Sequence, residues 1–158
     1  MKIHLYIQFY DYFCLMNKTE SPYCKCLHYS SNALARVMTR MAEDCFAPAG
    51  LSPSYAFVVM SVNRYPGILS GGLAEKMMLT PSTVTRLMEK LETQGLVKRV
   101  QEGRKTLVFP TPSSVALNDT ILQGWQDLNL RITAVLGIEQ AGALTQEIYN
   151  AAVNLSGR

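Results

Sequence analysis

The sequence predicts a mainly α-helical protein with one small β-hairpin, and three observations lead to this fold class. Apolar residues recur at helical spacing along most of the chain. Residues 96–110, LVKRVQEGRKTLVFP, instead hold two extended runs around a polar tip, the pattern of a hairpin. The chain has 158 residues, of which 48% are hydrophobic and 17% are charged. That composition supports one sizeable core, either within one chain or shared with a partner.

The helix with the clearest boundaries follows Thr80. Its apolar face has the i, i+3, i+4, i+7 spacing of a buried stripe and consists of Val84, Leu87, Met88 and Leu91. The Thr80 hydroxyl can cap the first turn, and Pro81 suits the first helical position because its missing N–H would be unpaired there. Gly95 suits a left-handed stop. Both ends of this helix are therefore predicted from the sequence.

The opposite face of this helix begins with short hydroxyl side chains and continues with cations. At about 100° per residue, these side chains lie opposite or beside the apolar stripe: Ser82, Thr83, Thr85, Arg86 and Lys90. Short hydroxyls let the helix N-terminus approach a ligand closely while Arg86 reaches farther, which suits the edges of DNA bases and the adjoining phosphates. Taken alone, the segment is equally compatible with a surface helix whose Ser and Thr only cap it.

The flanking segments favour a DNA-binding interpretation. Upstream, residues 70–79, SGGLAEKMML, predict a short helix capped by Ser70, so that two helices joined by a tight turn form a helix-turn-helix. Downstream lies the hairpin, with Arg104 and Lys105 at its tip and Pro110 ending its second run. This order of elements forms a winged helix, which lays its second helix in the major groove and its wing along the backbone or in the minor groove.

Charge gives an independent test. The chain carries 15 Lys+Arg and 12 Asp+Glu, a formal net charge of +3. Residues 80–111 contain six basic and three acidic side chains, and the rest of the chain balances at nine of each. A positive excess confined to the second helix and the wing is what a phosphate-binding surface requires, although a charge run can also be only a solvated face. The predicted partner is double-stranded DNA.

Residues 73–99, LAEKMMLTPSTVTRLMEKLETQGLVKR, resemble the core signature of the MarR family of bacterial transcription regulators. A looser resemblance extends over about residues 27–155. The resemblance implies a winged-helix regulator, most simply a repressor, that a small-molecule effector or an oxidant releases from DNA. It also implies an effector pocket between the dimer helices and the DNA-binding lobe.

The predicted wing fits the family pattern of an acidic residue, one intervening residue and an arginine, here Glu102-Gly103-Arg104. By this resemblance Arg104 reaches the minor groove and Glu102 holds it in position. Met78 departs from the glycine that the family often has in the turn. The short wing and its Phe-Pro-Thr-Pro exit, residues 109–112, depart from the family as well.

Three parts are expected along the chain. Residues 66–111 form the winged helix-turn-helix lobe, residues 27–65 and 112–158 form a helical dimerisation region, and residues 1–26 form an N-terminal extension to which the sequence assigns no role. Residues 113–158 hold only six charged side chains, and their apolar residues spread round more than one helix face. Such helices need cover on more than one side, which predicts an obligate homodimer on a pseudo-palindromic operator. A thick monomeric core is the alternative.

The first residues, MKIHLYIQFYDYFCLMNK, are apolar and aromatic, but they lack the small-residue cleavage site of a signal peptide and are too short to span a membrane. We therefore expect a cytoplasmic protein with no membrane contact. Met16 is an alternative start, and residues 1–15 are otherwise candidates for the dimer interface.

No export signal is recognised in the sequence, so a disulfide framework is not expected among its four cysteines, Cys14, Cys24, Cys26 and Cys45. A metal site is not expected either, because on a helix Cys26 would point away from the face shared by Cys24 and His28. The segment around Cys24 resembles the hydroperoxide-sensing, OhrR-like branch of the family, with Cys24 at the position of the reactive cysteine. His28 replaces a tyrosine of that branch, so buried, inert cysteines are favoured over a redox sensor.

An enzyme and a protein-binding adaptor are the two alternative function classes. The chain has two histidines, no Gly-rich phosphate loop and no HExxH motif, so we expect no catalytic residues, no cofactor and no enzyme activity. A winged-helix adaptor that binds proteins rather than DNA is harder to distinguish from a DNA-binding regulator. Arg86 and Arg104 favour DNA, because an adaptor has no need of both.

Overall fold

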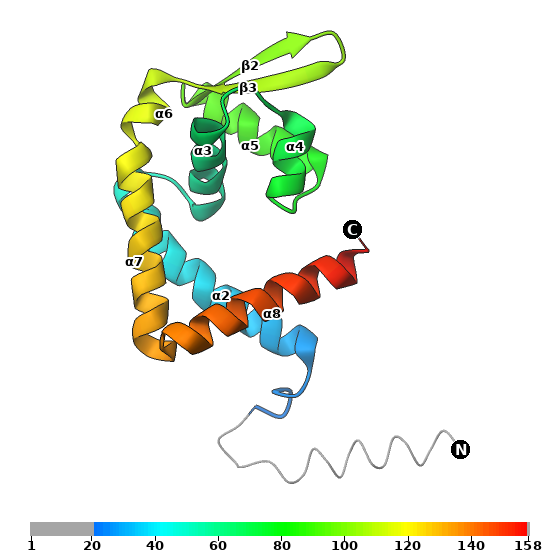
Figure 1. Cartoon of the computed structure of the whole chain (residues 1–158), viewed down its shortest axis with the longest axis vertical. Helices are drawn as coiled ribbons and strands as arrows, with labels where there is room; N and C mark the ends of the chain where they lie inside the picture. Colours follow the sequence, from blue (N-terminus) through cyan, green and yellow to red (C-terminus); the bar gives the residue numbers. More distant parts are fainter. Residues whose placement is uncertain (1–20, 158) are drawn as a thin grey trace, which may run out of the picture. The chain divides into compact units, whose positions relative to one another are not determined.

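The computed structural model describes residues 21–157 and confirms a mainly helical chain with a small sheet (Figure 1). In chain order the elements are α2 (Leu27–Phe46), the 3-10 helix η1 (Ala47–Ala49), α3 (Pro53–Arg64), β1 (Ile68–Leu69), α4 (Ser70–Lys76), α5 (Pro81–Thr93), β2 (Val97–Glu102), β3 (Lys105–Pro110), α6 (Pro112–Ala116), α7 (Asn118–Leu136) and α8 (Ile138–Ser156). The chain divides into two compact units within α2, after Arg40.

The described part of the first unit is a turn followed by the first turns of α2. The rings of Tyr23 and Tyr29 lie 5.4 Å apart between centroids, and the Ser30 hydroxyl donates to the Cys24 carbonyl oxygen at 2.8 Å. Asn32 donates to the His28 carbonyl oxygen at 2.7 Å. The expectations about residues 1–15, including Cys14 and the alternative start, lie outside the described residues.

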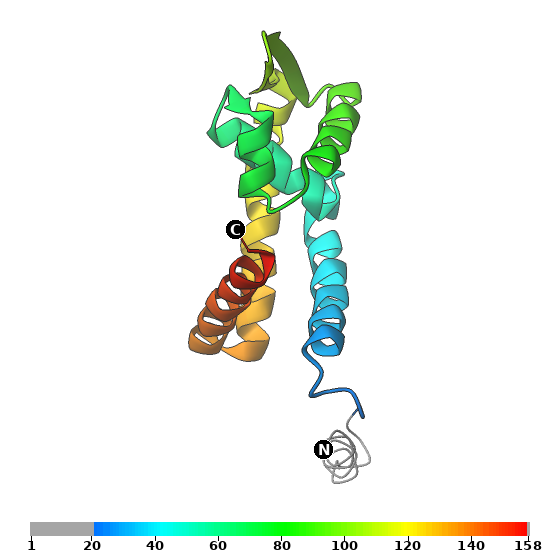
Figure 2. The ribbon, with the colours of Figure 1, turned by 90° about the vertical axis from the view of Figure 1, so that its right-hand side faces the viewer.

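The second unit contains the predicted winged helix. Helices α3, α4 and α5 pack together, and the β2–β3 hairpin lies against them, as Figures 1 and 2 both show. Its core is made of apolar side chains that burial removes from water, and the largest fully buried ones are Phe46, Leu73, Met88, Leu91 and Ile121. Helix α7 leads away from this lobe, and α8 turns back from the end of α7.

The sheet has three antiparallel strands in the order β1-β3-β2. The hairpin pairs Glu102 with Lys105, so the turn is only Gly103 and Arg104, tighter than the predicted polar tip. Gly103 has φ +58°, which explains a glycine there. Strand β1 was not predicted, because Ile68 and Leu69 are too few to show alternation; Ile68 pairs with Val108.

The ends of α5 are confirmed, whereas the expected cap of α4 is wrong. Thr80 is the N-cap of α5, and Gly95 follows the helix with φ +71°. Ser70 does not cap α4: it is the first residue of the helix and makes no capping hydrogen bond. The N-cap is Leu69, because its pairing with β3 keeps it extended up to the helix. Helix α4 also ends earlier than predicted, and Met78 takes φ +52° in the turn to α5.

A polar network around the buried Ser114 joins the lobe to the helices that follow it. Ser114 is fully buried, accepts a hydrogen bond from the Thr111 backbone N–H at 3.0 Å, and lies 3.0 Å from the Asn63 amide oxygen. Asn63 donates to the Ser114 carbonyl oxygen at 2.9 Å and to the Asn118 side chain at 3.2 Å. The Thr111 hydroxyl donates to the Gly95 carbonyl oxygen at 2.7 Å. These bonds join α3 to both α6 and α7. They also join Thr111, the residue before α6, to the turn after α5.

The C-terminal part of the chain is helical, as predicted, and most of it forms α7 and α8. Helix α7 packs on η1 and α3, and Gly124 lets it approach the Cys45 carbonyl closely. Within residues 21–157, no single helix is long and apolar enough to cross a membrane; residues 27–49 and 53–64 reach that length and composition only together, with a bend at the break.

Candidate nucleic-acid interface

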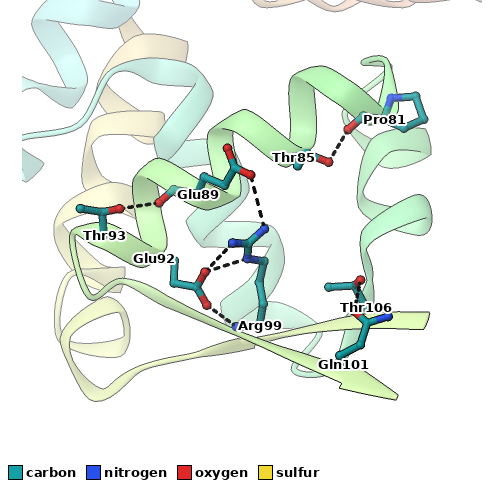
Figure 3. Close-up of polar contacts among 8 residues, drawn as sticks. All are labelled: Pro81, Thr85, Glu89, Glu92, Thr93, Arg99, Gln101 and Thr106. Atoms are coloured by element: carbon teal, nitrogen blue, oxygen red, sulfur yellow. Dashed lines mark hydrogen bonds and ion pairs between the residues drawn. The ribbon is translucent and has the colours of Figure 1, made fainter. Parts of the chain in front are cut away.

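The N-terminus of α5 is built around one hydroxyl. Thr80 Oγ1 accepts a hydrogen bond from the Thr83 backbone N–H at 3.3 Å. The same oxygen lies 2.8 Å from the Thr83 hydroxyl and 3.1 Å from the Ser82 hydroxyl. The Thr85 hydroxyl donates to the Pro81 carbonyl oxygen at 2.9 Å, as Figure 3 shows. The hydroxyls predicted to meet DNA are therefore already bonded within the helix.

These bonds decide what each hydroxyl can offer. A hydroxyl has one proton and two lone pairs. Because Thr85 places its proton on Pro81, it faces a ligand as an acceptor, which matches the amino groups of adenine or cytosine in the major groove. Ser82 and Thr83 share Thr80 Oγ1, and either member of each pair can be the donor. They can therefore present either a proton or a lone pair.

The predicted site residues of α5 lie where the helical periodicity put them. Ser82, Thr83, Arg86 and Lys90 are exposed, and Thr85 is half-buried at the edge of the apolar face. On the opposite side, Val84, Met88 and Leu91 are buried and Leu87 is half-buried. The short hydroxyls and the two cations thus share one accessible side of a helix whose other side is fixed in the core.

The predicted wing residues gather at the hairpin tip. Glu102, Arg104 and Lys105 are all exposed. The hairpin is braced near the tip by Gln101, whose amide donates to the Gly103 carbonyl oxygen at 2.9 Å. The Gln101 amide oxygen also accepts from the Thr106 hydroxyl at 2.8 Å, as Figure 3 shows. In the part of the chain that the structure describes, neither Glu102 nor Arg104 forms an ion pair. The supporting role of Glu102 stays a prediction.

An ion pair that the sequence interpretation missed joins α5 to the wing. Arg99, on β2, donates from Nε to Glu92 Oε2 at 2.8 Å, and its Nη2 lies 2.7 Å from the same oxygen. The Arg99 backbone N–H donates to Glu92 Oε1 at 3.0 Å. Nη1 lies 3.9 Å from Glu89 Oε1, so both carboxylates of the helix meet one guanidinium (Figure 3).

The ion pair has an electrostatic signature. The hydrogen bonds that the Arg99 side chain and backbone donate hold the pKa of the Glu92 carboxyl below its usual range. A signal in the sequence could have revealed the pair. Val97 is an apolar residue of a predicted strand, and a residue two positions along a strand points to the same face, so Arg99 is expected on the side of the strand that packs on the helices.

The pairing of Arg99 separates the cations of the lobe into two kinds. Arg99 is half-buried and committed to two carboxylates. The other five basic residues between positions 80 and 111 are exposed and form no ion pair within residues 21–157: Arg86, Lys90, Lys98, Arg104 and Lys105. These five are free to meet phosphates.

The cysteines are arranged differently from the expectation of burial. Cys45 is buried near the end of α2, but Cys24 and Cys26, which lie in the turn before α2, are exposed in the single chain. Within residues 21–157, no group of three or more His, Cys, Asp and Glu side chains is placed to hold a metal ion.

Comparison with known proteins agrees with the fold. The model of the MarR family matches residues 51–103, which run from the start of α3 through the hairpin tip and confirm the resemblance noted in the sequence. No curated protein sequence matches the chain.

Solved structures of similar fold have low sequence identity. The transcriptional repressor CouR bound to p-coumaroyl-CoA superposes with a TM-score of 0.76 at 18% identity, over 86% of this chain and 98% of the other. The PcaV transcriptional regulator from Streptomyces coelicolor, in complex with its natural ligand, gives 0.75 at 18% identity, over 87% and 97%. The Mycobacterium tuberculosis regulator MosR in complex with DNA gives 0.73 at 20% identity, over 84% and 97%.

Proposed function

We propose that this chain, whose residues 51–103 match the model of the MarR family, is a homodimeric regulator of transcription that binds double-stranded DNA in a sequence-specific manner. It acts as a repressor, in the cytoplasm and without enzyme activity, and a small ligand or an oxidant releases it from its operator. The observation that carries the proposal is the exposed side of α5, where short hydroxyls and Arg86 face outward from a helix fixed in the core.

The two DNA-contacting elements have separate tasks. Helix α5 enters the major groove with its N-terminal residues toward the bases, and the wing carries Arg104 to the neighbouring minor groove. Arg86 can donate two hydrogen bonds to a guanine, whereas Lys90, Lys98 and Lys105 offer point charges to phosphates. Specificity therefore resides mainly in α5, and the wing adds affinity and orientation.

Exposed apolar side chains on α7 and α8 support the dimer. In the single chain Leu130 is 65% exposed, Val135 78%, Ile138 81% and Leu155 78%. Large apolar side chains gathered on two successive helices are costly in water and are typical of a surface that a partner covers. A second copy would bury them and would place two α5 helices for two half-sites of a pseudo-palindromic operator. Light scattering should therefore give twice the chain mass at micromolar concentration.

A small ligand is the proposed releasing signal. CouR and PcaV were solved with bound small molecules, and the shared fold makes an effector of this kind a reasonable expectation here. Such a ligand must bind the DNA-competent and the released arrangements with different affinity, because otherwise it shifts no equilibrium.

A redox signal through Cys24 is the second candidate, favoured by the exposure of this thiol. Exposed thiols can reach an oxidant, whereas buried ones cannot. The test is the Cys24→Ser variant: it should bind DNA as the wild type does but lose its release by an organic hydroperoxide. Release of both proteins to the same extent would remove Cys24 from the mechanism.

The experiment that tests DNA recognition begins with selection of bound fragments from genomic DNA by the purified protein. The recovered operator is then titrated with wild type, Arg86→Ala and Lys90→Ala. Arg86→Ala should lose about 1–3 kcal/mol on the operator and relax base preference at one position. Lys90→Ala should weaken binding to operator and scrambled duplex alike and make the salt dependence shallower. Equal operator affinity of Arg86→Ala and wild type would remove the role assigned to Arg86.

A further inference from the structure

The Glu92–Arg99 ion pair lies between the two elements that the proposed function requires to contact DNA together. Glu92 is on the last turns of α5, and Arg99 is the third residue of β2. One carboxylate receives three hydrogen-bonding groups of the same residue: the backbone N–H at 3.0 Å, Nε at 2.8 Å and Nη2 at 2.7 Å. The backbone bond fixes the strand itself and not only the side chain.

The chain segment that connects the two elements is short. Only residues 94–96 separate α5 from β2, and Gly95 takes a left-handed conformation among them. Beyond Arg99, β2 continues to Glu102 and the hairpin turn. At about 3.3 Å per residue, the tip lies at least 10 Å from the ion pair, so a tilt of roughly 15° at Arg99 would displace it by about 2.6 Å. A displacement of that size breaks a hydrogen bond to DNA.

We infer that Arg99 is a positioning residue for operator binding: through Glu92 it locks the wing strand onto α5 and so sets the distance between the major-groove and minor-groove contacts. Arg99 itself does not bind DNA, because its guanidinium is committed to carboxylates on the helix. This inference rests on the proposed function, since it concerns the geometry of two DNA-contacting elements.

Glu89 provides a matched control on the same helix. It is three residues from Glu92, is exposed, and approaches Arg99 only at 3.9 Å, without the backbone bond. Removing either carboxylate makes the lobe more positive by one charge, which by itself strengthens binding to DNA. Of the two substitutions, only removal of the Glu92 carboxylate removes hydrogen bonds between α5 and β2. Charge alone and positioning therefore predict opposite effects for Glu92→Gln.

The experiment measures the affinities of wild type, Glu89→Gln and Glu92→Gln for the selected operator and for a scrambled duplex. Glu89→Gln should bind both at least as tightly as the wild type. Glu92→Gln should bind the operator about tenfold more weakly, a difference of 1.4 kcal/mol, while its affinity for the scrambled duplex does not fall. Operator affinity of Glu92→Gln equal to or tighter than that of Glu89→Gln would overturn the inference.

A footprint separates positioning from a general loss of structure. With Glu92→Gln, protection of the minor-groove sugars from hydroxyl radical by the wing should weaken, whereas protection of major-groove guanine N7 atoms from dimethyl sulfate by α5 should persist. A loss of both protections in parallel would mean that the pair only holds the fold, and would also overturn the inference. Circular dichroism checks that the variant is folded; Arg99→Lys, which keeps the charge but cannot donate from two nitrogens, gives the same comparison if Glu92→Gln does not fold.

The two proposals fail in different ways. If the wild-type protein binds no duplex from the genomic selection, the DNA-binding function itself is wrong. If the wild type binds an operator and Glu92→Gln binds it equally well with an unchanged footprint, DNA binding stands and only the positioning role of Arg99 is wrong.

Discussion

Replacing Gly124 by alanine should destabilise the protein, although alanine is the better helix former. Gly124 is buried in α7, and a Cβ placed on it would lie 2.6 Å from the Cys45 carbonyl oxygen and 3.1 Å from Phe46 Cδ1. An ordinary contact between a carbon and a carbonyl oxygen is about 3.3 Å or longer. The nearest obstacle is backbone in the last turn of α2, so no side-chain rotation can relieve the clash, and α7 has to shift.

The expected loss follows from two opposing contributions. Overpacking of a well-packed site costs about 1–3 kcal/mol. The gain in helix propensity from glycine to alanine is about 1 kcal/mol. Because the obstacle is backbone, the upper part of the overpacking range applies, and the net destabilisation is roughly 1–2 kcal/mol. For a chain of this size, that lowers the unfolding temperature by about 2–8 °C.

The assay is thermal unfolding followed by circular dichroism at one fixed protomer concentration, because oligomer stability depends on concentration. Gly71→Ala in α4 is the control: Gly71 is exposed, and a Cβ there would meet nothing within 4 Å. It should leave stability unchanged or raise it by up to about 1 kcal/mol. Unfolding of Gly124→Ala at or above the wild-type temperature would refute the close approach of α7 to the end of α2.

Three further changes test other parts of the structure. At Met78, whose φ is +52°, glycine should be more stable than alanine by about 1 kcal/mol in chemical denaturation, since both remove the same side chain and only glycine adopts this conformation freely. Ser114→Ala should cost about 1–3 kcal/mol in the same assay, because the Thr111 backbone N–H and Asn63 Oδ1 both lose the hydrogen bond that they make with the buried Ser114 hydroxyl. Glu92→Gln should lower the free energy of unfolding by about 0.2–1 kcal/mol at pH 7. Because folding lowers the pKa of Glu92, this loss of stability is fully present above pH 4.5, the ordinary pKa of the group. It should vanish as the pH falls through the pKa of the folded protein.

The features that the sequence predicted correctly are those that depend on local spacing. The α5 stripe, its Thr80 cap, Pro81 and the stop at Gly95 are each determined within one or two turns of chain. Helical period and cap chemistry act over that distance, so a single sequence displays them. The hairpin was predicted for the same reason, since its two strands are adjacent in the chain.

The features that were missed depend on segments far apart in the chain. The length of β1 depends on pairing with β3, about forty residues later, and that pairing also moves the cap of α4 from Ser70 to Leu69. The Asn63–Ser114 hydrogen bonds join residues 51 positions apart. Neither residue stands out in its own segment, because an Asn near a helix end and a Ser after a proline are ordinary local features. Tertiary contact alone makes them important.

The ion pair at Arg99 also changes how the charge of the lobe should be counted. The sequence treats the six basic and three acidic residues of positions 80–111 alike. In the structure Arg99 faces Glu92 and Glu89, and this group carries a net charge of −1 on the side of α5 that meets β2. The remaining five cations face only one carboxylate, Glu102, so the surface left for phosphates carries +4 rather than +3. The modest total charge therefore underestimates the local field, because part of the acidic charge is used to hold the wing in place.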